Sequence, residues 1–211
     1  MMKQLRLLVS VLVVPLLLAL ACLTWWWLED SRSNQNRYDS LIKQASIRYQ
    51  VPPSLIRAVI WRESRFDPKA YGQADERGLM QVRVPAASEW VKAENIKGFQ
   101  PDDLYDPQTN ILAGTWYLAR ATSRWKDMDT PYIFGLAEYN AGRVHARRWA
   151  KDLENPDADS FIQAIDFPTT KKYILDIQER YLFYLNQPKP TFWEHSRELI
   201  EYYWTIWTSK R

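Results

Sequence analysis

Cysteine, histidine and glycine are all scarce in this chain of 211 residues, and each shortage excludes a class of protein. The one cysteine, Cys22, excludes an internal disulfide and a metal site built from several thiolates. The two histidines, His145 and His195, lie far apart and do not have the spacing of metal ligands. Six glycines exclude a collagen-like or glycine-rich repeat. A metalloenzyme is therefore not expected.

A large excess of charge of one sign is also missing. The formal net charge is +3, and Lys3 and Arg6 precede the first apolar run, so residues 29–211 carry only about +1. No cluster of lysine and arginine dominates a predicted face, so a nucleic acid is not the expected partner. Hydrophobic residues make up 46% of the chain, which excludes a wholly disordered protein. The length favours one domain with an appendage, and we expect a monomer.

One long run without charge extends over residues 7–28. As a helix it would span roughly 33 Å, enough to cross a hydrocarbon core of about 30 Å. Lys3 and Arg6 precede the run and acidic residues follow it, so the positive-inside rule places the rest of the chain outside the cytoplasm. Three tryptophans, Trp25–Trp27, stand where an interfacial belt is expected. The pattern predicts a single-pass anchor in the bacterial inner membrane, with the body on the periplasmic side.

Two other interpretations also export the body. Ala19-Leu20-Ala21 matches the small-residue pattern at which a signal peptide is cleaved. Ala21-Cys22 fits a lipoprotein that is acylated at Cys22. The apolar run continues past Cys22 through Trp27, which is unusual at the start of a mature protein, so the uncleaved anchor is the preferred interpretation.

The rest of the chain reads as helices separated by clear breaks. We expect a polar tether over 29–37, a folded domain over 38–187, and an aromatic helix over 188–211 that follows Pro188 and Pro190. Within the domain, proline and threonine mark where helices begin. The predicted helices run over 38–49, from Pro53, from Pro107, from Pro131 to Gly142, and from Thr169 or Thr170 to Leu185. Residues 70–105 have a weaker period, and a small β element is expected there.

Glu63 stands out on the helix that begins at Pro53. It falls on the same stripe as four apolar residues: Leu55, Ile56, Val59 and Ile60. A carboxylate on an apolar face is costly unless it is paired, protonated or functional. Desolvation raises a carboxyl pKa, which suits a general acid near neutral pH. The spacing alone also fits a core glutamate paired with Arg62 or Arg65, and it favours that interpretation.

Two further motifs are ambiguous when each is taken alone. Gly78-Leu79-Met80-Gln81 suggests a turn whose glutamine offers both a donor and an acceptor to a polar ligand. Glu138-Tyr139-Asn140-Ala141-Gly142 closes a predicted helix. Either motif is also explained as ordinary local structure.

The motifs gain specificity together, because they occur in a fixed order with Glu63-Ser64-Arg65-Phe66-Asp67-Pro68 before them and Phe167–Tyr173 after them. In this arrangement the chain closely resembles the catalytic domain of the soluble-type lytic transglycosylases, which cleave bacterial peptidoglycan. The resemblance covers roughly residues 38–185. It implies a lysozyme-like fold of the mainly α (α+β) class.

The resemblance also implies roles for individual residues. Glu63 corresponds to the single catalytic acid and base. The residues implied to contact substrate are Ser64, Met80, Gln81, Glu138, Tyr139, Asn140 and Tyr173. Three positions depart from the family pattern: Glu138 replaces a small residue, Val82-Arg83-Val84 precede Pro85 where a proline is expected sooner, and Thr169 replaces an acid.

The implied reaction breaks the bond between N-acetylmuramic acid and N-acetylglucosamine without water. Protonated Glu63 would donate to the leaving oxygen and then accept a proton from the C6 hydroxyl, which closes a 1,6-anhydro ring. Neither a cofactor nor a metal is required. A hydrolytic muramidase is an alternative, and it would need a second carboxylate. Glu138 and Glu76 are the candidates, although Glu76 is expected to be a solvated surface residue. An inactive peptidoglycan-binding scaffold is another.

Overall fold

The computed structural model describes residues 16–17, 19–21, 23–24, 35–151, 153 and 157–187. The predicted anchor over 1–28 lies mostly outside these residues, and the predicted C-terminal helix over 188–211 lies wholly outside them. Within the described ranges, no helix is both long and apolar enough to cross a membrane.

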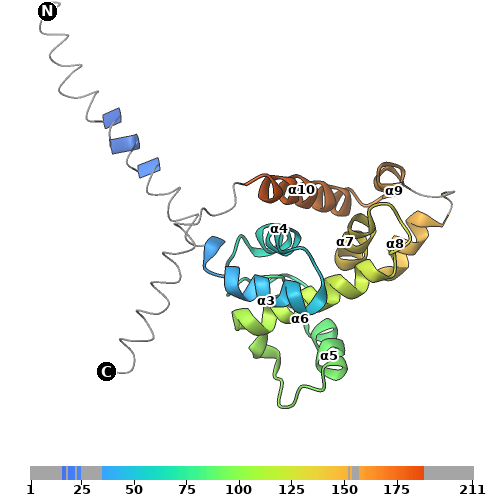
Figure 1. The fold of residues 1–211 in the computed structure, drawn as a ribbon, viewed down its shortest axis with the longest axis horizontal. Coiled ribbons are helices and arrows are strands. Elements are labelled where there is room, and N and C mark those ends of the chain that lie inside the picture. The colour runs from blue at the N-terminus through green and yellow to red at the C-terminus, as the bar shows by residue number, and fades with distance from the viewer. Residues whose placement is uncertain are drawn as a thin grey trace, which may run out of the picture.

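Helix α6 extends across much of the domain (Figure 1). Helices α3, α5 and α7 contact α6 directly, while α10 covers α4 and α7. The helices, in chain order, are α3 (Asp39–Tyr49), α4 (Pro53–Ser64), α5 (Val84–Ala93), α6 (Pro107–Ser123), α7 (Pro131–Ala141), α8 (Arg143–Ala150), α9 (Ala158–Ala164) and α10 (Pro168–Leu185), with a 3-10 helix, η2 (Pro101–Tyr105), before α6.

Prolines begin several of these helices, as the sequence predicts. Pro53, Pro107 and Pro131 each occupy the first turn, where the missing N–H has no partner to lose. The predicted start of the last helix, at Thr169 or Thr170, is too late by one or two residues. Helix α10 already begins at Pro168 without a side-chain cap, and Thr170 instead donates its hydroxyl hydrogen to Asn140, in α7, at 2.8 Å.

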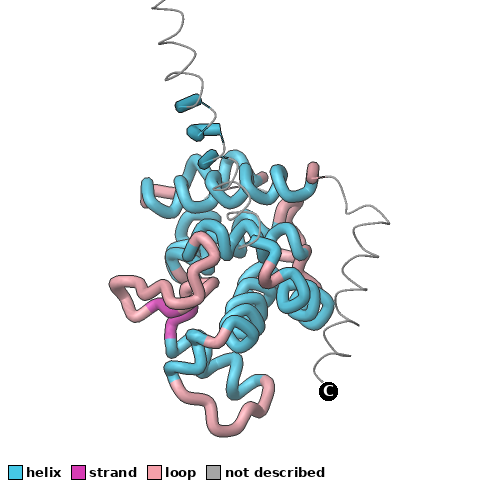
Figure 2. The backbone as a smooth tube through the Cα atoms, turned by 90° about the vertical axis from the view of Figure 1, so that its left-hand side faces the viewer, coloured by secondary structure: helices cyan, strands magenta, loops and turns pink. Residues whose placement is uncertain are grey.

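The expected small β element is present and consists of two short strands (Figure 2). β1 (Glu76–Arg77) pairs antiparallel with β2 (Val82–Arg83), and Glu76 lies opposite Arg83. Helices α5, α8 and α9 were not predicted. Each has ten residues or fewer, and prolines and glycines interrupt the sequence period around them.

The hydrophobic core continues across α3 to α10, so the described helices share one interior. The apolar stripe predicted on α4 is fully buried: Leu55, Ile56, Val59 and Ile60 expose 2% of their surface or less. Phe134 and Phe161 join α7 to α9, with ring centroids 4.1 Å apart. The fold is thus mainly α with a small β element, as predicted.

The last described residues of the predicted tether contact this domain. Tyr184 of α10 donates a hydrogen bond to Gln35 at 3.0 Å, and Arg57 of α4 donates to Asn36 at 3.3 Å. The domain therefore holds the chain by residue 35.

Candidate active site

A cavity of about 310 Å³ opens where α4, the β1–β2 turn and α7 meet. These segments are far apart in sequence, and the core packing of α6 and α10 brings them together. The polar side chains that line the cavity are Glu63, Glu76, Gln81, Arg83, Tyr117, Tyr139 and Asn140.

Glu63 lies in the last turn of α4 and is partly buried. Its Oε1 accepts a hydrogen bond of 2.7 Å from the hydroxyl of Tyr173, in α10. Burial raises the pKa of Glu63 to about 7, against the lowering effects of this hydrogen bond and of the positive charge of Arg62. The carboxyl is therefore poised to be either protonated or ionised near neutral pH, as a general acid and base requires.

The alternative of a core glutamate paired with a neighbouring arginine is not what the structure shows. Arg62 binds Asp176 through Nε at 3.1 Å. The guanidinium of Arg65 lies over the ring of Trp61, 3.3 Å from its centroid. Among the described residues, no cation forms a salt bridge with Glu63.

The Gly78–Gln81 turn is fixed by Asn110, a buried residue of α6. Asn110 accepts a hydrogen bond from the N–H of Met80 at 2.8 Å and donates to the carbonyls of Arg77 and Leu104, each at 2.7 Å. Gly78 has φ +71°, and a Cβ there would overlap the carbonyl oxygen of Leu104. Only glycine therefore fits this position without strain.

Gln81, at the end of the turn, lines the cavity in a left-handed conformation with φ +47°. Its side-chain Nε2 donates to the carbonyls of Ala70, at 3.1 Å, and Gly78, at 3.0 Å. Both amide hydrogens are thus used within the protein, and Oε1 is left as an acceptor.

Ser64 and Met80 lie behind the residues that line the cavity and support them. The hydroxyl of Ser64 donates to the carbonyl of Leu79 at 2.7 Å, which ties α4 to the turn. The side chain of Met80 is fully buried, and its carbonyl accepts the hydroxyl hydrogen of Tyr139 at 2.9 Å. The structure therefore places both residues behind the expected contact surface.

Tyr139, Asn140 and Tyr173 lie around Glu63. Tyr139 and Asn140 line the cavity from the end of α7, and Tyr173 reaches Glu63 from α10. Burial, together with the negative charge of Glu63, raises the pKa of both tyrosines well above the ordinary value. Both hydroxyls therefore stay neutral hydrogen-bond donors across the physiological range.

Glu138 does not lie where it was expected. It is 2% exposed, forms an ion pair with Arg124 and accepts a hydrogen bond from Trp125 Nε1 at 3.3 Å. It lines a different cavity, of about 360 Å³, with Arg143 and other residues of α8. Its position supports neither a substrate contact beside Glu63 nor the role of a second carboxylate there.

Sequence reasoning also missed or undervalued two residues. Glu76 was expected to be a solvated surface residue, but it lines the cavity with Glu63. Asn110 was not singled out, although a polar residue directly before Ile111 on a buried helix face is a usable signal. Among the described residues, no group of histidine, cysteine and acidic side chains is arranged to hold a metal ion.

The hydrogen bond between Tyr173 and Glu63 can be tested without any substrate. A hydrogen bond to the ionised form stabilises that form, so its loss in Tyr173→Phe should raise the pKa of Glu63 above about 7. The pKa is measured by NMR titration of the carboxyl carbon, with Tyr132→Phe as the control. An unchanged pKa in Tyr173→Phe would show that this contact does not act on Glu63.

Comparison with known proteins identifies the family. Residues 40–162 match the family model described as "Transglycosylase SLT domain". The soluble lytic murein transglycosylase of Escherichia coli K12 is 32% identical over 158 residues, which cover 73% of this chain and 24% of that protein. The membrane-bound lytic murein transglycosylase F of Desulfosudis oleivorans is 36% identical over 126 residues, 58% of this chain and 26% of that protein.

A solved structure gives the same answer. An inactive mutant of the lytic transglycosylase Slt of Pseudomonas aeruginosa superposes with a TM-score of 0.66 at 26% identity, covering 75% of this chain and 26% of that one. The chain thus spans about a quarter of the length of these relatives. The match confirms the resemblance read from the motifs, and the chain belongs to the transglycosylase SLT domain family.

Proposed function

We propose that this chain is a peptidoglycan lytic transglycosylase in which Glu63 is the single catalytic acid and base. The observation that carries the proposal is the environment of Glu63: a carboxyl with a pKa of about 7, at the wall of a cavity, hydrogen-bonded to Tyr173. Membership of the family, and the printed names of its relatives, supply the substrate class.

The first half of the proposed reaction uses protonated Glu63 as an acid. Glu63 donates its proton to the glycosidic oxygen, and the bond from that oxygen to the anomeric carbon of the muramic acid breaks. Positive charge then develops on the anomeric carbon. The N-acetyl group of the same sugar, and the carboxylate now present on Glu63, both stabilise it.

The second half returns the proton to Glu63. The carboxylate takes the proton of the muramic C6 hydroxyl, whose oxygen attacks the anomeric carbon and closes the 1,6-anhydro ring. Nucleophile and electrophile belong to one sugar, so the attack gains from proximity. No water, metal or cofactor enters this sequence. Gln81, Tyr139 and Asn140 would position the sugar.

The mass of the released products tests this proposal. Purified sacculi are digested with the full chain in detergent, and the muropeptides are analysed by mass spectrometry. We expect products that end in 1,6-anhydromuramic acid, lighter by one water than the hydrolytic products. Reducing muramic acid as the main product would make the protein a muramidase. Binding to sacculi without any cleavage would make it an inactive scaffold.

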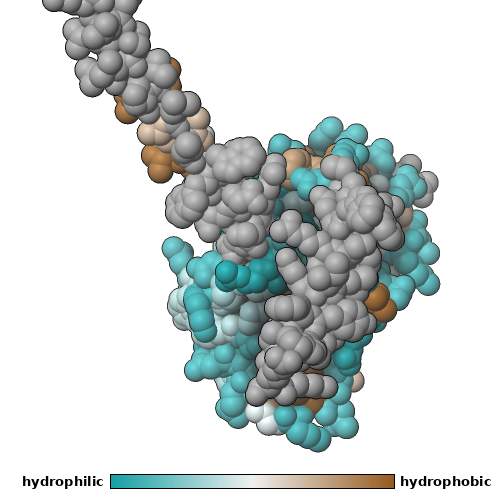
Figure 3. Space-filling view, turned by 60° about the vertical axis from the view of Figure 1, so that its left-hand side comes forward, coloured by the Kyte–Doolittle hydropathy of each residue, from teal (hydrophilic) through white to brown (hydrophobic). Residues whose placement is uncertain are grey.

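We further propose that residues 1–28 anchor the chain in the inner membrane and residues 29–37 form a tether. The domain of 38–187 would then act in the periplasm as a monomer, followed by an aromatic helix over 188–211. Leucines in the described part of the first segment are 51–60% exposed. Hydrophobic atoms accordingly lie at the surface there, while the domain surface in the same view is mostly hydrophilic (Figure 3). Some relatives are named membrane-bound.

The proposed membrane anchor can be tested by fractionation. The full chain should sediment with membranes, resist extraction by high salt and keep its original N-terminus. Fractionation followed by N-terminal sequencing measures both properties. A mature protein that starts at Cys22, with or without attached lipid, would replace the anchor by a lipoprotein or a secreted protein.

A further inference from the structure

Glu76 is a second carboxylate in the cavity of Glu63, and no role in the proposed reaction has been given to it. It lies at the start of β1, is partly buried, and accepts a hydrogen bond at Oε2 from the N–H of Ala74 at 2.8 Å. That bond holds one oxygen of the carboxylate. Glu76 Oε1 has no hydrogen-bond donor among the described residues.

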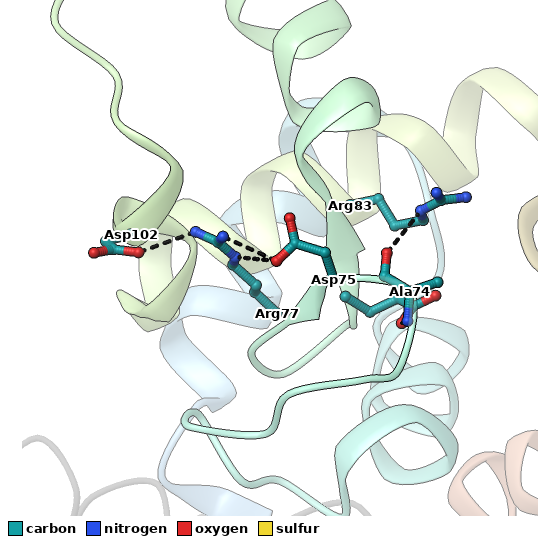
Figure 4. A network of polar contacts seen from close by, with 6 residues as sticks. Ala74, Asp75, Arg77, Arg83 and Asp102 are labelled. Carbon is teal, nitrogen blue, oxygen red and sulfur yellow. Dashed lines mark hydrogen bonds and ion pairs between the residues drawn. The ribbon is translucent and has the colours of Figure 1, made fainter.

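The neighbouring cations form no salt bridge with Glu76 in the described part of the chain, although Arg83 lines the same cavity. Arg77 binds Asp75 at 2.9 Å and Asp102 at 3.0 Å, and Arg83 donates to the carbonyl of Ala74 at 3.2 Å (Figure 4). Glu76 therefore forms no salt bridge within the described part of the chain. Its negative charge is left to act on the cavity, and it contributes to the raised pKa of Glu63.

Gly72 provides the space that Glu76 occupies. A Cβ at residue 72 would overlap Oε2 of Glu76 and would lie only 2.9 Å from Oε1 of Gln81. The main chain at this point is also fixed, because the N–H of Gly72 donates to the carbonyl of Glu76 at 2.8 Å. Two acceptor groups thus converge above one glycine.

The α7 side of the cavity has the opposite character. Oδ1 of Asn140 accepts the hydroxyl hydrogen of Thr170 at 2.8 Å, which leaves the amide hydrogens of Asn140 as donors. Glu76 and Gln81 therefore offer acceptors on one side of the cavity, where Arg83 also lies, and Asn140 offers donors on the other. An N-acetylated sugar carries both hydroxyl and amide donors and an acetyl carbonyl acceptor, so it can satisfy both sides at once.

We propose that Glu76 is a substrate-contacting residue, with Gly72 as the residue that admits it. The carboxylate of Glu76 accepts hydrogen bonds from hydroxyl or amide groups of the sugar bound beside Glu63, and so holds that sugar for protonation. Hydrogen bonds to an ionised acceptor are among the stronger ones in proteins. The assignment rests on the proposed function, since it takes the same N-acetylated glycan as the ligand.

Binding and turnover are measured separately to test this role. The affinity for peptide-free glycan strands is measured with the full chain carrying Glu63→Gln, so that the ligand is not consumed. We expect Glu76→Ala to weaken binding on the order of 10- to 100-fold, the range for lost hydrogen bonds to a charged group. Glu76→Gln keeps the shape of the side chain but loses its charge, so its affinity should fall between those of the parent Glu63→Gln chain and Glu76→Ala. Glu179→Gln, an exposed glutamate outside the cavity, should not change the affinity.

Gly72→Ala gives an independent handle on the same contact. The added methyl group pushes the ends of the Glu76 and Gln81 side chains aside and lies close to Cβ of Glu76. The protein should stay folded while binding weakens about tenfold, equivalent to about 1.4 kcal/mol. In the presence of Glu76→Ala, the same substitution should weaken binding less than it does alone, because the carboxylate is already gone and only Gln81 remains to be displaced.

The outcomes separate this inference from the proposed function. Suppose that the Glu63→Gln chain binds glycan and the wild-type chain cleaves it. A change of affinity below twofold on adding Glu76→Ala would then overturn the role of Glu76 alone. A second contrary result is that Glu76→Ala lowers both the affinity and the melting temperature while Gly72→Ala leaves the affinity unchanged. That result would make the role of Glu76 structural and would also overturn the proposal. If the Glu63→Gln chain does not bind glycan and the wild-type chain does not cleave it, both proposals are overturned.

Discussion

Glu63→Gln is expected to reduce the release of 1,6-anhydro products by at least 10²- to 10⁴-fold, the usual contribution of a general acid or base. Glutamine keeps the size of the side chain and can still accept the hydrogen bond from Tyr173, but it cannot deliver and recover a proton. Both halves of the proposed reaction use this one group, so no other step compensates. The rate is measured as soluble anhydro-muropeptides released from sacculi.

The stability of the same variant separates loss of chemistry from loss of fold. The pKa of Glu63 is about 7 in the folded chain, against an ordinary value of 4.5. Because the pKa is higher in the folded chain than in the unfolded one, burying Glu63 does not reduce the free energy of unfolding below pH 4.5, where the carboxyl is protonated in both states. The cost of this burial grows as the pH rises through 7, to at most about 3 kcal/mol. Glu63→Gln should therefore match the wild type near pH 4 and be more stable near pH 8.

Thermal unfolding at these two pH values is the control for the activity measurement. An inactive variant that is also less stable at pH 8 would show that the loss of activity reflects damage to the fold. Full activity in Glu63→Gln would remove the proposed mechanism. The next carboxylate to replace would then be Glu76, which lines the cavity, and not Glu138, which lies outside it.

Asn110→Ala is expected to give the largest loss of stability of any single substitution considered for this protein. Asn110 is 1% exposed and satisfies three backbone groups, those of Met80, Arg77 and Leu104. Alanine leaves all three buried without a protein partner, and each such group costs about 1–3 kcal/mol. We expect a loss of about 3–5 kcal/mol and a melting temperature lower by roughly 10 °C.

Calorimetry or chemical denaturation measures this loss, and Gln108→Ala, on the exposed side of the same helix, is the matched control. Below the unfolding transition, the variant should also bind glycan more weakly, because the turn that carries Gln81 is no longer held. A loss below about 1 kcal/mol would mean that water replaces the asparagine in this network.

The helical core could be predicted because local rules determine much of it. Prolines in the first turn place the starts of α4, α6 and α7, and the apolar period of α4 correctly places Glu63 beside a buried face. The short helices α5, α8 and α9 were missed because tertiary packing, rather than a long apolar period, stabilises helices of this length.

Side-chain direction explains the errors in the site. Consecutive helical residues differ by about 100° in direction, so the adjacent residues Glu138 and Tyr139 face different cavities. The sequence motif contains both residues and does not indicate which of them faces the cavity of Glu63. Long-range partners were equally hidden: nothing in the local sequence indicates that Ser64 binds the carbonyl of Leu79, or that Gly72 makes room for Glu76.

The contacts of Gln35 and Asn36 with α10 and α4 set a working distance for the protein. If the membrane segment ends at Leu28 as proposed, the six residues 29–34 connect it to Gln35, which is the first point held by the domain and lies seven residue steps away. A fully extended chain of that length covers at most about 25 Å. The folded domain would then begin close to the membrane surface, and the cavity would act on the glycan layers nearest the membrane rather than across the whole depth of the wall.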